Sequence, residues 1–187
     1  MPQIWSPTGF AGFLDSLPAL PDVVICAVGA MGDQAQSQRD PAAAAQVLRA
    51  NFEGPALILG LLAERFEAAG RGVIVGISSV AGDRGRASNY VYGAAKAGFT
   101  AFLSGLRNRL ARGPVRVITV KPGFVATRMT EGLPLNPRLT AQPAEVAEAI
   151  RAADLRGRDV IYVRRIWRLV MAIIRALPEF LFKKTRL

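Results

Sequence analysis

The chain has 187 residues, 51% hydrophobic and 20% charged, which suits one folded domain with a core and excludes a disordered chain. It has one cysteine and no histidine, which excludes a disulfide framework, a Cys/His zinc site and every mechanism that needs an imidazole. Of the formal net charge of +10, residues 151–187 contribute +7, from ten Lys and Arg against three Asp and Glu. The charge is therefore a local property of the C-terminal region, and we expect neither nucleic-acid binding nor a metal site.

Four short apolar runs predict strands that are buried on both faces of a parallel sheet. Helical patterns lie between these runs. The predicted strands are Val23–Val28, Val73–Ile77, Val115–Val120 and Val160–Val163, and the predicted helices are Pro41–Ala69, Tyr90–Arg112 and Pro143–Ala153. This alternation predicts an α/β fold with a doubly wound parallel sheet and right-handed crossovers.

Ligands of such sheets bind beyond the carboxyl ends of the strands. Three of the predicted strands are followed there by small or turn-forming residues, at Gly29, Ser79 and Pro122–Gly123. These residues allow backbone and ligand to approach closely. No signal peptide and no membrane-spanning segment is expected.

Tyr92 and Lys96 carry the strongest chemical signal in the chain. Residues four apart on a helix lie on one face, so the phenol and the amine are neighbours. An ammonium group close to a phenol favours the phenolate and is expected to lower the pKa of Tyr92, which makes a general acid/base without histidine. Ser79 stands 13 residues before Tyr92, and its hydroxyl is suited to bind a carbonyl oxygen.

These residues and their spacing resemble the short-chain dehydrogenase/reductase family, over about residues 10–165. The resemblance implies a Rossmann-like fold and an NAD(P)-dependent oxidoreductase that interconverts a ketone and a secondary alcohol. It assigns the catalytic serine, tyrosine and lysine to Ser79, Tyr92 and Lys96, and the helix asparagine to Asn51. Asn51 is expected to anchor a proton-relay water. An alternative is that Asn51 is an ordinary polar residue that bends the helix.

The same resemblance assigns the cofactor-binding residues. They are Ala27, Gly29, Tyr92, Lys96, Pro122, Gly123 and Thr127. Thr127 has an alternative role as a helix cap. The sequence does not indicate whether the cofactor is NAD or NADP.

One departure from the family concerns the glycine-rich turn that binds the dinucleotide pyrophosphate. The segment from Thr8 to Gly12 mimics such a turn only weakly, and no buried strand precedes it. We therefore interpret the sequence as a Rossmann-like fold from which the first βαβ unit is absent. Two explanations remain open: a misplaced start or truncated gene, which we favour, and a genuinely shortened protein.

A narrower resemblance is to the reductases of lipid-linked keto-sugars, such as the reductase half of the decaprenylphosphoryl-ribose epimerase pair of cell-wall synthesis. Part of it lies in the basic, apolar C-terminal tail. We divide the chain into a partial reductase domain, 1–163, and a basic amphipathic helix and tail, 164–187. Arg164, Arg168 and Arg175 are expected to form one helical stripe. The tail is expected to lie in a membrane interface, with packing on the sheet or on a partner subunit as the alternative.

Two hypotheses of function follow. The first is a ketoreductase in the cytoplasm, peripheral at the inner face of the plasma membrane, with a small-molecule or lipid-linked carbonyl substrate. The resemblance also implies a homo-oligomer built on the helices 41–69 and 90–112. The second is a catalytically inactive, membrane-associated interaction module derived from a reductase. Arg84 and Arg86 are interpreted as solvated loop residues, with phosphate binding as an alternative.

Overall fold

The fold is built on a four-stranded parallel sheet, seen in a computed structural model that describes residues 7–185. The strands lie in the order β1-β2-β3-β6, and every neighbouring pair is parallel. They are β1 (Val23–Cys26), β2 (Val73–Ile77), β3 (Arg116–Pro122) and β6 (Val160–Val163). The predicted α/β fold with a parallel sheet is confirmed. The predicted run Val23–Val28 pairs only as far as Cys26, and the predicted third strand extends two residues further, to Pro122.

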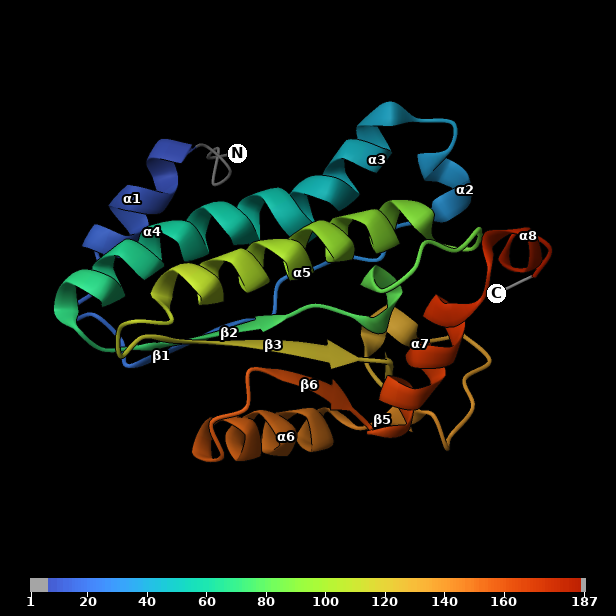
Figure 1. The fold of residues 1–187 in the computed structure, drawn as a ribbon. Helices are drawn as coiled ribbons and strands as arrows, with labels where there is room; N and C mark the ends of the chain where they lie inside the picture. Colours follow the sequence, from blue (N-terminus) through green and yellow to red (C-terminus); the bar gives the residue numbers. More distant parts are fainter. Residues whose placement is uncertain (1–6, 186–187) are drawn as a thin grey trace.

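Helices cover the two faces of this sheet (Figure 1). One face carries α3 (Pro41–Leu48), α4 (Gly54–Ala69) and α5 (Tyr90–Leu110), and the other carries α6 (Pro143–Leu155). The predicted helix 41–69 is continuous, but a π-helical segment, Arg49–Glu53, joins α3 to α4. Helix α4 ends as predicted at Gly70, which has the left-handed φ of 64° that glycine tolerates.

Two apolar layers hold these elements together. Phe66, Phe99 and Leu103 are almost fully buried between the helices α4 and α5 and the sheet. Ile118 and Ile150 belong to the layer between the sheet and α6. The predicted burial on both faces is confirmed for β2 and β3, which pack against helices on each side. It is wrong for the edge strand β1, where Val23 and Ile25 are 46% and 52% exposed.

Several short elements were not expected from the sequence. They are α1 (Pro7–Asp15), α2 (Gln34–Ser37), β4 (Phe124–Val125), β5 (Thr140–Ala141) and the 3₁₀ turns η2 (Val80–Gly82) and η3 (Arg128–Thr130). The segment from Thr8 to Gly12 lies within helix α1, so it does not form a glycine-rich turn between a strand and a helix.

The C-terminal region forms α7 (Ile166–Ala176) and α8 (Glu179–Phe182). Trp167, Met171 and Ile174 are buried in a cluster with Val80, so one face of α7 packs on the domain as the alternative interpretation expected. The predicted arginine stripe is wrong at Arg164, which precedes the helix with a φ of 51° and forms an ion pair with Glu145. Residues 1–6 of the predicted domain and 186–187 of the predicted tail lie outside the described residues.

No helix within residues 7–185 is long and apolar enough to cross a membrane. The longest, α5, carries Lys96 and, in its last turn, Arg107 and Arg109.

Candidate active site

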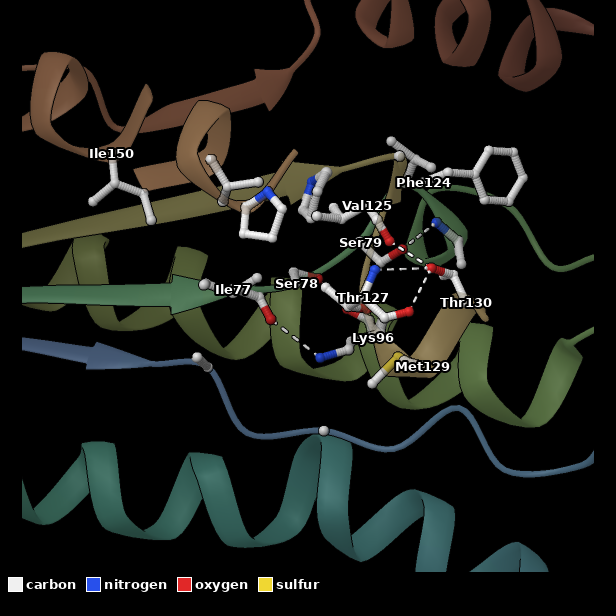
Figure 2. Close-up of a pocket in the computed structure, with 18 of the residues that line it drawn as sticks. Ile77, Ser78, Ser79, Lys96, Phe124, Val125, Thr127, Met129, Thr130 and Ile150 are labelled. Atoms are coloured by element: carbon white, nitrogen blue, oxygen red, sulfur yellow. Dashed lines mark hydrogen bonds between the residues drawn. The ribbon is translucent and has the colours of Figure 1, made fainter. Parts of the chain in front are cut away.

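A cavity of about 690 Å³ opens at the carboxyl ends of the strands and continues along the sheet beside α6. Figure 2 shows Ile77 and Ile150 along one part of it and Ser79, Thr127 and Met129 at the other. Its lining includes Ser79, Tyr92 and Lys96 and every residue predicted to bind the cofactor, including Ala27 and Gly29. The structure thus brings the predicted site residues to one cavity, with Asn51 immediately behind its wall.

Ser79 follows strand β2 and is the N-terminal cap of the 3₁₀ turn η2. Its Oγ accepts a hydrogen bond from the backbone N–H of Ala81 at 3.1 Å, which leaves the hydroxyl proton available to a ligand. Gly82 ends this turn directly against helix α5. A Cβ atom at Gly82 would lie 2.7 Å from the backbone nitrogen of Ala97, so only glycine lets the Ser79 turn approach this closely.

Tyr92 and Lys96 lie on the inner face of α5, as their spacing predicted. The Lys96 Nζ atom is 5.7 Å from the centre of the Tyr92 ring and donates a hydrogen bond to the carbonyl of Ile77 at 3.1 Å (Figure 2). This bond ties the amine to the end of β2, next to Ser79. Ser79 and Tyr92 line the same cavity, and the Ser79 hydroxyl is close enough to lower the pKa of Tyr92, so the two hydroxyls face one region of the cavity.

Burial dominates the ionisation of this group. Desolvation raises the pKa of Tyr92 above its usual value, and the hydrogen bond from Ser79 opposes this only in part. Burial lowers the pKa of Lys96 to about 8. The expected lowering of the pKa of Tyr92 is therefore wrong in sign here, because removal of the phenol from water dominates its ionisation. Tyr92 is held in its protonated form, which suits a proton donor.

Asn51 is fully buried in the π-helical segment between α3 and α4. Its Nδ2 donates to the carbonyls of Ala30 and Val47 at 2.6 and 2.8 Å, while its Oδ1 is buried with no hydrogen-bond partner. A Cβ atom at Gly29 would lie 2.6 Å from this Oδ1 and 3.2 Å from Lys96 Nζ. Gly29 is thus the residue that lets the β1 loop reach Asn51 and Lys96. π-Helical segments often occur at functional sites, and this one carries a predicted site residue.

The segment after β3 forms the opposite wall of the cavity. Pro122 ends the strand, and Gly123 packs against the ring of Trp167, where a Cβ atom would overlap the indole. Thr127 precedes the 3₁₀ turn η3, and its backbone N–H donates to Thr130 Oγ1 at 3.2 Å. Thr127 therefore lines the cavity at a helix cap, and the two roles predicted for it are compatible in space.

The residues present fit one half of a nicotinamide dinucleotide. The Lys96 amine and the close backbone approach at Gly29 line the cavity where a ribose and nicotinamide would lie, and the orphaned Oδ1 of Asn51 lies directly behind Gly29. Within residues 7–185, the segment from Thr8 to Gly12 is helical and does not form a glycine-rich turn for the pyrophosphate.

Sequence reasoning missed two contributions to this site. Trp167, from the predicted tail, lines the cavity and contacts Phe124 edge to face. Asp83 is buried with Lys121 at 2.5 Å and accepts a hydrogen bond from the Tyr162 hydroxyl at 2.8 Å, which fastens the loop after Ser79 to the ends of β3 and β6. The lysine Lys121, directly after the predicted strand Val115–Val120, was the only sequence signal for this contact.

Arg84 also differs from its prediction. Its side chain is 15% exposed and donates to the carbonyls of Ile174 and Leu177 at 2.6 Å, at the C-terminal end of α7. Arg84 is therefore a helix cap that joins the C-terminal region to the Ser79 loop, and the solvated-loop interpretation is wrong for it.

The chain is similar in sequence to known oxidoreductases. Residues 15–137 match the family model for short chain dehydrogenases. The chain is 39% identical to an uncharacterized oxidoreductase of Mycobacterium tuberculosis over 160 residues and 39% identical to one of Streptomyces coelicolor over 165 residues. These matches cover 86% and 87% of this chain but 64% of each relative, so the chain spans less than two thirds of their length.

The fold is also that of a solved short chain dehydrogenase from Burkholderia cenocepacia, determined in complex with NADP. The two structures superpose with a TM-score of 0.76 at 24% identity, over 93% of this chain and 74% of the other. On the family model and these relatives, the chain belongs to the short-chain dehydrogenase family.

Proposed function

We propose that the chain is an NAD(P)-dependent oxidoreductase that interconverts a ketone and a secondary alcohol. The observation that carries the proposal is the meeting of Ser79, Tyr92 and Lys96 in one cavity, where a hydrogen bond fastens Lys96 to the end of β2. The oxidoreductases to which the chain is similar, and the NADP held by the solved relative, support the same activity.

Each residue has a role that follows from its contacts. Ser79, whose Oγ accepts the N–H of Ala81, donates a hydrogen bond to the substrate carbonyl oxygen and keeps its proton. Tyr92, held protonated by burial, donates the proton that converts this oxygen to a hydroxyl. Lys96 holds the ribose of the cofactor and stabilises the phenolate left on Tyr92, and the free Oδ1 of Asn51 binds a water that returns the proton. The bound cofactor supplies the hydride.

Titration of the 187-residue chain with NADH and NADPH tests this proposal against the inactive-module alternative. We expect saturable binding of at least one of them, measured by the fluorescence of the reduced nicotinamide. Gly29→Ala weakens this binding, because its Cβ displaces Asn51 and Lys96, whereas Gly60→Ala, where a Cβ meets nothing within 4 Å, leaves it unchanged. A folded chain that binds neither nucleotide favours the interaction module.

We further propose that the enzyme works at a membrane surface and that its substrate is a lipid-linked sugar. Leu169 and Ile173 on the outer side of α7 are 59% and 57% exposed, and Phe180 of α8 is 61% exposed. Basic residues flank this surface, namely Arg165, Arg168, Lys183 and Lys184. Anionic lipid attracts each such charge by about 1 kcal/mol, so the surface suits an anionic bilayer. We also propose a homo-oligomer, supported by the exposed Leu57 and Leu61 on α4.

Vesicle flotation tests the membrane contact. We expect the chain to float with vesicles of phosphatidylcholine and phosphatidylglycerol and the double variant Leu169→Ser/Ile173→Ser to remain at the bottom, because it removes apolar surface that the fold does not bury. The control is Leu155→Ser, which changes a leucine that is 70% exposed at the far end of α6. Equal flotation of the double variant and the unchanged chain contradicts the membrane contact.

A further inference from the structure

The loop between Ser79 and Tyr92 carries three charged residues, of which two have partners. Asp83 is paired with Lys121 and Tyr162, and Arg84 caps helix α7 and forms an ion pair with Glu179. These contacts hold the loop at both the sheet and the C-terminal region. The third charged residue, Arg86, is therefore presented to the cavity by a segment that is fixed before any ligand binds.

The Arg86 side chain has no hydrogen bond or ion pair within residues 7–185. Its Nε is buried without a partner, and burial lowers the pKa of the guanidinium from its ordinary value. The buried Nε–H of Arg86 is costly, because this donor loses water and gains no partner in exchange. The solvated-loop interpretation therefore does not hold for the Nε end of the guanidinium, and the unpaired charge is free to bind an anionic ligand in the cavity.

Other charges on the cavity wall do not supply that partner. The described lining residues include one carboxylate, Asp154, and it is paired with Arg116 at 2.8 Å. The remaining cations of the lining, Lys96 and Arg151, are engaged with the Ile77 carbonyl and with Glu148. The cavity therefore presents an unpaired positive charge in the loop between Ser79 and Tyr92.

Asn89 is a second residue of the same cavity wall with a buried polar atom that has no hydrogen-bond partner. It stands at the N-terminal cap of α5, where an asparagine side chain ordinarily accepts a backbone N–H. Here Gln34 Oε1 accepts the N–H of Val91 at 3.1 Å in its place. The Oδ1 of Asn89 is left buried without a partner, in a residue that lines the cavity.

We infer that Arg86 binds an anionic group of the carbonyl substrate, a carboxylate or a phosphate, and that the Asn89 Oδ1 on the same wall binds a hydroxyl of that substrate. The inference deepens the proposed function and rests on it, since it names the kind of ketone that the cavity takes. A guanidinium binds either anion through two parallel charge-assisted hydrogen bonds. The Asn89 amide is placed to accept a hydrogen bond from a substrate hydroxyl.

Matched ligand pairs test the inference at equilibrium, without turnover. The probes are levulinate against methyl levulinate and dihydroxyacetone phosphate against dihydroxyacetone, with binding measured by titration calorimetry in the full chain. We expect the anionic member of at least one pair to bind about tenfold or more tightly than the neutral one. Arg86→Gln removes this preference and leaves the affinity for the neutral member unchanged, while Arg86→Lys retains part of it.

Two controls test whether the preference belongs to Arg86 and to the substrate. Arg112→Gln removes one positive charge from an exposed arginine beyond the far end of α5 and is expected to keep the preference. NADPH affinity is measured in parallel: a loss confined to NADPH in Arg86→Gln overturns the substrate assignment, because the anion is then a phosphate of the cofactor. Equal binding of both members of each pair also overturns it. Failure of the chain to oxidise NADPH with any ketone counts against the proposed function but leaves the binding preference, and hence the anion site, standing.

Discussion

The Tyr92→Phe variant is expected to lose ketone reduction by roughly a hundredfold to ten-thousandfold, the usual contribution of a general acid. The substitution removes the proton donor and leaves a ring of the same shape against Lys96, so the fold and the nucleotide affinity are expected to stay close to those of the unchanged chain. The measurement is the initial rate of reduced-nicotinamide consumption with a saturating ketone, together with the thermal unfolding midpoint.

Tyr90→Phe is the matched control, because Tyr90 lies two residues earlier on α5 and is 45% exposed. It is expected to keep full activity. Activity of Tyr92→Phe within tenfold of the unchanged chain would falsify the assignment of Tyr92 as the proton donor.

The Lys96→Met variant is expected to lose activity and gain stability. The pKa of Lys96 in the folded chain is about 8, below its ordinary value of 10.5, so between these values the unfolded chain binds more protons and stability rises with pH. Below about pH 8 the charged amine therefore costs the folded state about 3 kcal/mol, by the usual conversion of pKa differences. Methionine removes this cost and loses the hydrogen bond to Ile77, so the net gain is up to about 3 kcal/mol.

Denaturant unfolding between about pH 7 and about pH 9 measures this effect. The gain of Lys96→Met over the unchanged chain is expected to shrink by about 1 kcal/mol across that range as Lys96 loses its proton. Cys26 and Tyr92 face Lys96, and burial raises the pKa of each, while the Lys96 charge opposes this for Cys26. Both chains are therefore compared in a Cys26→Ala background, which removes the coupled thiol. A destabilised Lys96→Met, or a difference that does not change with pH, contradicts the desolvation of the amine.

These opposite effects are typical of functional sites, where activity depends on groups that the fold holds at a cost. Lys96 and Arg86 both lose hydration in the cavity, and this burial lowers the pKa of each. The buried pair of Asp83 and Lys121 instead forms an ion pair. The molecule therefore separates charges that hold the Ser79 loop from charges that are left for ligands.

The sequence by itself determined the parallel sheet, the order of strands and helices, and the residues Ser79, Tyr92 and Lys96. Apolar runs such as Val73–Ile77 are decided by local pattern, and a spacing of four on a helix fixes which side chains share a face. The π-helical segment around Asn51 left no local signal, because a single inserted residue changes the hydrogen bonding without interrupting the helical pattern.

Only the tertiary structure decided the sign of the pKa shifts, the partners of the arginines and the place of α7. The pKa of Tyr92 depends on how much water the whole fold excludes, which no spacing of two residues encodes. Arg84 and Arg86 are two residues apart in one loop, yet the first caps a helix that begins 82 residues later and the second faces the cavity without a partner. Such contacts join segments that are distant along the chain, and for this reason local pattern could not distinguish a structural arginine from one left for a ligand.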